Sequence, residues 1–296
     1  NGGESTIAML FSGQGAQYHG MAKALYEQNP SFTALMDNCD VLVQEHAGWS
    51  LIDVLWGDDV DKVNVTEYTQ PAIFCLEYCL TQHWLSLGVK PSVMIGHSVG
   101  EYCAAVTAGI LTLEAAIQLI VARGRLMVEL TQPGDMVAVL ADDSVVNPLL
   151  KKYEGVQLAA KNAPNNMVLS GTSEVVKALI SECNDTNIET RELIVSHAFH
   201  SSMMEPMLDA FSKVAQSIEF KPAQLPIIST VSGKLNEGEM STPAYWVQQV
   251  SAAVQFSNAL LALEEVADQS IDIALEVGPS VTLVGLAKQI LTDTNI

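Results

Sequence analysis

The stretch that most constrains the fold is VMIGHSVGEYCAAVTAG, residues 93–109. An apolar run that predicts a buried strand ends at Gly96, and a helix-like run begins at Gly100. The pentapeptide Gly-His-Ser-Val-Gly therefore places Ser98 on a sharp strand-to-helix turn, where a serine Oγ is exposed. The flanking glycines lack the Cβ atoms that would collide in so tight a turn. G-x-S-x-G also occurs by chance, but the strand before it and the helix after it favour Ser98 as a nucleophile, with the N–H of Val99 facing its oxyanion.

Strands and helices alternate through the first 131 residues, which indicates a mostly parallel sheet covered by helices on both faces. Between residues 132 and 196 the order changes to β-α-β-β-α-β, the pattern of a ferredoxin-like unit. Strand-helix order then returns, and one helix is expected over residues 245–267. The sequence thus predicts an α/β core formed by residues 1–131 and 197–296, with residues 132–196 as an inserted α+β subdomain.

Charge and cysteine content narrow the functional classes. A net charge of −20, from 34 acidic and 14 basic residues, argues against nucleic acid as a partner. No apolar run is long enough to predict a membrane span. Five cysteines without a CxxC pair indicate a reducing, cytoplasmic setting, and Cys75 and Cys79 are interpreted as packing residues rather than metal ligands. Because the chain begins with Asn1 rather than Met, we expect its N-terminus to be processed or cut from a longer protein, and no signal peptide is recognised.

A serine nucleophile needs a general base, and the chain has six histidines. The turn should point His97, which adjoins Ser98, in another direction, so packing or substrate contact is its simpler role. His197 and His200, in the string SHAFHS, follow the expected subdomain, and residue patterns alone do not choose between them. The other three lie in helix-like or connecting segments, where surface or packing roles are simplest: His19, His46 and His83.

Eight motifs follow one another along nearly the whole chain: FSGQGAQYHGM, TQPAIF, GHSVGEYCAAVTAGIL, ARGRLM, NAPNNMVLSG, SHAFHSSMMEPM, YWVQQ and LEVGPS. Together they resemble the malonyl-CoA:acyl carrier protein transacylases, and most of all the acyltransferase domains of polyketide or polyunsaturated fatty acid synthases. The resemblance implies a hydrolase-like α/β core with a ferredoxin-like insertion, in agreement with the element pattern. It also implies transfer of a malonyl group from malonyl-CoA to the phosphopantetheine thiol of an acyl carrier protein. The implied enzyme has no tightly bound cofactor or metal, and flanking synthase domains are expected in the longer protein.

The resemblance also implies roles for individual residues. Ser98 becomes the acylated nucleophile and His200 its base, while the N–H groups of Gln14 and Val99 form the oxyanion hole. Arg123 binds the free carboxylate of the malonyl group, and Gln249 orients the histidine through its backbone carbonyl. Further residues are expected to line the substrate site: Gln70, His97, Asn162, His197 and Phe199.

Two details refine the resemblance. The string HAFH at residues 197–200 and the small side chain of Val99 are similar to those of malonyl-type members. The sequence departs from the family pattern at SAAVQF, residues 251–256, where a proline is often found.

Two other functions stay open. A hydrolase on the same scaffold would use the same serine and histidine but pass the acyl group to water. A non-catalytic docking module would need none of these side chains. Arg123, one of three arginines, argues against a hydrolase of neutral acyl chains, although it could also be structural and pair with a helix acid such as Glu114.

Overall fold

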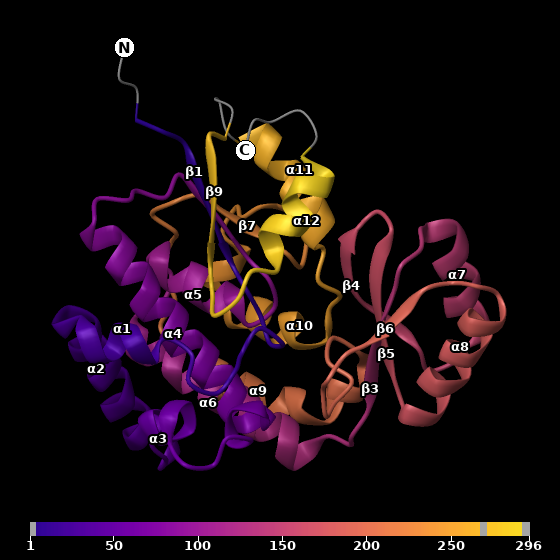
Figure 1. The fold of residues 1–296 in the computed structure, drawn as a ribbon, viewed down its shortest axis with the longest axis horizontal. Coiled ribbons are helices and arrows are strands. Elements are labelled where there is room, and N and C mark those ends of the chain that lie inside the picture. The colour runs from indigo at the N-terminus through magenta and orange to yellow at the C-terminus, as the bar shows by residue number, and fades with distance from the viewer. Residues whose placement is uncertain (1–3, 267–270, 292–296) are drawn as a thin grey trace.

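The computed structural model describes residues 4–266 and 271–291, and its central feature is a five-stranded sheet (Figure 1). The strand order is β8-β7-β2-β1-β9, and every neighbouring pair is parallel except β7 and β8. Apolar strands such as IAMLF and VMIG are nearly fully buried, as expected for a parallel sheet covered on both faces. The strands are β1 (Ile7–Phe11), β2 (Val93–Gly96), β7 (Ile227–Ser229), β8 (Lys234–Leu235) and β9 (Ile273–Val277).

Helices cover this sheet on two sides. In Figure 1, α11 and α12 lie on one side of the strands, and α4, α5 and α6 lie on the other. None of the helices within the described ranges has both the length and the apolar character needed to cross a membrane. The bounds are α1 (Lys23–Gln28), α2 (Pro30–Ala47), α3 (Leu51–Trp56), η1 (Lys62–Asn64), α4 (Thr66–Ser86), α5 (Gly100–Thr107), α6 (Leu113–Leu130), η2 (Ser202–Met204), α9 (Glu205–Gln216), η3 (Glu239–Ser241), α10 (Pro243–Ser251), α11 (Phe256–Val266) and α12 (Leu283–Ile290).

A second sheet stands apart from the first and is antiparallel throughout (Figure 1). Its strand order, β4-β5-β3-β6, together with two helices, is the ferredoxin-like topology predicted from the sequence. It encloses its own apolar cluster, which includes Val137, Leu169 and Leu179. The boundaries at residues 132 and 196 stay a prediction. The elements are β3 (Asp135–Val139), α7 (Asp143–Lys152), β4 (Gln157–Ala163), β5 (Asn166–Gly171), α8 (Ser173–Asp185) and β6 (Thr190–Glu192).

The single helix expected over residues 245–267 is wrong, because the chain leaves the helix between α10 and α11. In this short segment Val254 pairs with β4: its N–H donates to Ala159 O at 2.8 Å, and its carbonyl accepts from Lys161 N at 2.9 Å. Pairing with a strand requires extended backbone, so the contact with the second sheet overrides the local helix preference. The segment therefore joins the two sheets.

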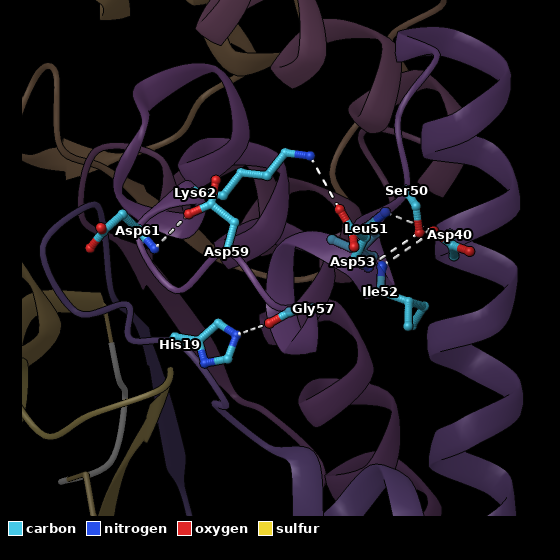
Figure 2. A network of polar contacts seen from close by, with 10 residues as sticks. All are labelled: His19, Asp40, Ser50, Leu51, Ile52, Asp53, Gly57, Asp59, Asp61 and Lys62. Carbon is cyan, nitrogen blue, oxygen red and sulfur yellow. Dashed lines mark hydrogen bonds and ion pairs between the residues drawn. The ribbon is translucent and has the colours of Figure 1, made fainter.

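The loop that follows β1 is fixed by polar contacts around α3 (Figure 2). The Asp40 carboxylate accepts from Leu51 N at 2.7 Å and so satisfies one of the free N–H groups at the start of that helix. At the other end, His19 Nε2 lies 2.8 Å from the Gly57 carbonyl, and Gly20 N donates to Leu55 O at 2.9 Å. The contacts of His19 and Gly20 hold the loop between β1 and α1, which carries the predicted oxyanion residue Gln14.

Candidate active site

Ser98 lies in the sharp turn between β2 and α5, as the sequence predicted. Its φ of 53° is left-handed, a conformation that is strained for a non-glycine residue and is often found at functional sites. The neighbouring chain leaves no room for side chains at the two glycines. A Cβ on Gly96 would lie 2.3 Å from Glu101 N, and a Cβ on Gly100 would lie 2.2 Å from Phe11 O. Gly96 thus allows the start of α5 to pack against the end of β2, and Gly100 allows it to pack against the end of β1.

His200 is the histidine that contacts Ser98, and the distance from Ser98 Oγ to His200 Nε2 is 2.6 Å. Its second ring nitrogen, Nδ1, lies 2.8 Å from the backbone carbonyl of Ala252. Since a carbonyl only accepts, Nδ1 carries the proton and Nε2 is free to accept one from the serine. Burial, followed by the charges of Arg123 and His97, lowers the pKa of His200 to about 3. The imidazole is therefore neutral at pH 7, the state that a general base needs.

The resemblance assigned the orienting carbonyl to Gln249, and in the structure Ala252, three residues later, makes the hydrogen bond to Nδ1. The Gln249 backbone also raises the pKa of His200, but by less than Ala252 does. Ala252 caps the C-terminus of α10, so its carbonyl has no helical partner and is available to the ring.

The other two histidines near the turn have different partners. His97 Nε2 lies 2.8 Å from Asn162 Oδ1, and the His97 ring packs against Phe256 with ring centroids 5.3 Å apart. His197 Nδ1 lies 2.7 Å from the hydroxyl oxygen of Ser196. Burial lowers the pKa of both histidines. The geometry thus separates His200 from His197, a choice that residue patterns alone left open.

Arg123 is a buried cation on α6, with a side chain 1% exposed. Its Nη1 donates to Gln70 Oε1 at 2.9 Å and its Nη2 to Gln249 Oε1 at 3.3 Å, while its Nε has no partner among the described residues. Both acceptors are uncharged amides. Glu114, named above as an alternative partner, instead lies 3.1 Å from His46, and the described residues form no ion pair with Arg123.

A cavity of about 550 Å³ opens between the two sheets and contains these groups. Its walls come from the loop after β1, the Ser98 turn, β4, β5, the segment before His200 and the start of α12. Four of the predicted site residues do not line it: Gln70, Val99, His197 and Gln249. The predicted site residues that do line it are Gln14, His97, Ser98, Arg123, Asn162, Phe199 and His200.

Sequence reasoning missed two groups that shape this site. Ala252 offered no signal through its side chain, although the departure of residues 251–256 from the family pattern lay at this place. Glu101, in the first turn of α5, is a fully buried carboxylate that accepts from Tyr245 Oη at 2.9 Å and from Thr230 N at 3.0 Å. Its position three residues after the turn serine was visible in the sequence, but its burial was not.

Comparison with known proteins decides the family, because residues 8–294 match the model described as the acyl transferase domain. The chain belongs to this family. The acyltransferase domain is 39% identical over 292 residues to the phenolphthiocerol synthesis polyketide synthase type I Pks15/1 of Mycobacterium marinum, a match covering 98% of this chain and 14% of that protein. It is 37% identical over 287 residues to the mycoketide-CoA synthase of Mycobacterium tuberculosis, covering 97% of this chain and 7% of that protein. The chain thus spans a small part of these relatives' length.

Solved structures share the fold of this acyltransferase domain. The acyltransferase domain from the second module of the salinomycin polyketide synthase superposes with a TM-score of 0.89 at 37% identity, covering 98% of this chain and 67% of that one. The malonyl CoA-acyl carrier protein transacylase from Clostridium perfringens gives a TM-score of 0.88 at 27% identity, covering 98% and 91%. These matches confirm the predicted family and the α/β fold class.

Proposed function

We propose that this acyltransferase domain moves a malonyl group from malonyl-CoA to the phosphopantetheine thiol of an acyl carrier protein, through an ester on Ser98. The observation that carries the proposal is that one cavity holds both the Ser98–His200 pair and the buried guanidinium of Arg123. The pair supplies a nucleophile and its base, and the guanidinium supplies a partner for the carboxylate that distinguishes malonyl from neutral acyl groups. The HAFH string and the small Val99 add support for malonyl.

In the first half-reaction, Ser98 Oγ attacks the thioester carbonyl while His200 Nε2 takes the hydroxyl proton. The Ala252 carbonyl holds the ring in place and stabilises the imidazolium that forms. The tetrahedral oxyanion then collapses, the CoA sulfur leaves with the proton from His200, and the malonyl ester remains on Ser98. In the second half-reaction, the carrier thiol attacks this ester with His200 as base, and the serine regains its proton.

The backbone around Ser98 supports the proposed oxyanion hole. Val99 follows the serine directly and caps α5, where the N–H groups at the start of a helix lack helical partners. Gly13 packs against the turn so closely that a Cβ there would lie 2.6 Å from His97 O and 3.4 Å from Ser98 Cβ. The backbone of the next residue, Gln14, is thereby held beside the serine. Its N–H and that of Val99 are the proposed donors to the oxyanion.

The surroundings of Arg123 support an anionic substrate. A buried guanidinium without a carboxylate partner is costly, and burial lowers the pKa of this one. Its Nε has no partner among the described residues, so it retains hydrogen-bonding capacity. A guanidinium can bind a carboxylate through two parallel hydrogen bonds, which an ammonium group does not match.

The test compares malonyl-CoA with acetyl-CoA in the wild type, Arg123→Ala and Arg123→Lys. Loss of a charge-assisted hydrogen bond costs about 1.5–3 kcal/mol, so Arg123→Ala should lower the malonyl-to-acetyl ratio of kcat/KM by about ten- to more than a hundredfold. Arg123→Lys keeps the charge without the planar fork and should recover only part of the ratio. Equal losses for both substrates would make Arg123 structural and would contradict the malonyl assignment.

Two further measurements separate transfer from hydrolysis. Intact-mass analysis after incubation with malonyl-CoA should show one acyl adduct, and that adduct should be absent in Ser98→Ala. Addition of a carrier protein should then discharge the adduct, with the malonyl group recovered on the carrier. Release of free malonate at the same rate with and without carrier would identify a hydrolase instead.

The proposed partners follow from this reaction. We propose malonyl-CoA as a substrate rather than a resident cofactor, and we assign no metal or tightly bound cofactor to the chemistry. An acyl carrier protein brings the phosphopantetheine thiol. Because the matched relatives are far longer than this chain, flanking synthase domains are also proposed.

A further inference from the structure

Glu101 is a buried carboxylate that the proposed acyl transfer does not use. It is fully buried in the first turn of α5, the helix that leads away from Ser98. Thr230 N donates to its Oε2 at 3.0 Å, and Tyr245 Oη donates to its Oε1 at 2.9 Å. A buried carboxylate is costly unless it is hydrogen-bonded, and these donors account for only part of its bonding capacity.

The remaining contact of Glu101 leads to Arg123 through a single amide. Gln249 Nε2 donates to Ser98 O at 2.9 Å and to Glu101 Oε1 at 3.4 Å, while Gln249 Oε1 accepts from Arg123 Nη2 at 3.3 Å. With the amide turned over, its oxygen would face two acceptors and its NH₂ group would face a guanidinium that has only donors. The orientation of the amide therefore follows from its partners, and the Glu101 carboxylate is one of the two acceptors that its NH₂ group faces.

We propose that Glu101 is a positioning residue that acts through Gln249 to aim the guanidinium of Arg123 at the acyl group on Ser98. The inference rests on the proposed function, because it concerns how the carboxylate of the acyl group is met. Glu101 itself lines no part of the cavity and touches no reacting atom. Burial raises the pKa of Glu101 to about 7, and in its ionised form this carboxylate, like Tyr102, raises the pKa of Arg123 against the effect of burial. Both effects keep a charged guanidinium in one orientation before the substrate arrives.

The test is Glu101→Gln, measured as the rate of Ser98 acylation by malonyl-CoA and by acetyl-CoA. We expect the malonyl-to-acetyl ratio of kcat/KM to fall by roughly fivefold, because residues in one hydrogen-bond network typically show coupling energies of this size. Most of the change should be a higher KM for malonyl-CoA. Tyr245→Phe is the matched control. It removes the hydroxyl that donates to Glu101 but leaves the Gln249 contacts, so it should lower the Tm and leave the ratio unchanged.

A double-mutant cycle tests whether Glu101 acts on substrate preference through Gln249. In a Gln249→Ala background, Glu101→Gln should produce no further change in the ratio, because the connecting amide is gone. If Glu101→Gln lowers the malonyl-to-acetyl ratio equally in the wild-type and Gln249→Ala backgrounds, the inference is overturned. It is also overturned if Glu101→Gln lowers the Tm and leaves this ratio unchanged. If Glu101→Gln does not fold, Glu101→Asp replaces it. This variant keeps the charge but withdraws it from Gln249, the most distant partner, and should lower the ratio in the same way; an unchanged ratio would overturn the inference.

The wild type separates this inference from the proposed function. A wild-type chain without preference for malonyl-CoA would refute the proposed function, and the role of Glu101 would fall with it. A wild-type preference that Glu101→Gln does not alter would refute the role of Glu101 alone.

Discussion

Replacing Gly100 by alanine should damage the active site more than it damages the fold. The added Cβ would lie 2.2 Å from Phe11 O and 2.8 Å from both Phe11 C and Ser12 O. Real Cβ contacts do not fall below 3.0 Å, so the start of α5 has to move away from β1. Overpacking of this kind typically costs about 1–3 kcal/mol of unfolding free energy. The same shift separates Ser98 from the loop that carries Gln14, and misplacement by about 1 Å can cost roughly a hundredfold in rate.

The assay measures both quantities on the same preparation. Urea unfolding gives the stability, and quenched-flow intact-mass analysis gives the rate of Ser98 acylation by malonyl-CoA. Gly285→Ala is the control, because a Cβ at this exposed position on α12 meets nothing within 4 Å. It should raise the unfolding free energy by about 0.5–1 kcal/mol and leave acylation unchanged. Acylation by Gly100→Ala within threefold of wild type would refute the claim that close packing of the turn on β1 positions the serine.

Four other measurements test the site and its surroundings. Because burial lowers the pKa of His200 to about 3, acylation should stay flat from pH 8 to about pH 5; a rate that falls with an apparent pKa near 6.5 would contradict this. The same depressed pKa stabilises the fold fully above about pH 6.5 and progressively less as the pH falls toward 3, so unfolding should be less acid-sensitive in His200→Ala. Burial raises the pKa of Glu77 well above its usual range, so Glu77→Gln should change the unfolding free energy at pH 7 by less than about 1 kcal/mol, and a loss above about 2 kcal/mol would show that the carboxyl is ionised. With a net charge of −20, affinity for an anionic carrier protein should stay flat or improve with moderate salt, and a steep loss would show that a basic patch dominates.

Much of the fold could be predicted because the signals were local. The apolar run before Gly96 and the helix after Gly100 give the turn directly, and the change of element order near residue 132 gives the second sheet. The break between α10 and α11 could not be predicted in the same way. Residues 245–267 have a continuous helix pattern, and the break depends on a strand partner about ninety residues earlier in the chain.

Some residues of the candidate site could likewise be predicted from the sequence, whereas others depend on contacts between distant parts of the chain. Ser98 could be proposed from its place on a strand-to-helix turn, and the role of Arg123 from the resemblance to the family. The partner of His200 Nδ1 is a backbone carbonyl, which every residue possesses, so its identity depends on where the helix ends. For the same reason, the link from Glu101 to Arg123 needs three-dimensional contacts that no spacing encodes.

The short segment between α10 and α11 sets a condition for building chimeric enzymes. Ala252 holds His200, and two residues later Val254 pairs with β4, so one stretch of backbone is bonded to both halves of the molecule. Exchange of residues 132–196 for the same segment of another acyltransferase domain would leave Val254 facing a foreign strand. A misfit at Val254 would displace Ala252, which holds His200, although neither junction of the graft lies near residues 252–254 in sequence. Grafts that carry residues 252–255 together with the inserted sheet should therefore retain more activity than grafts cut at its two ends.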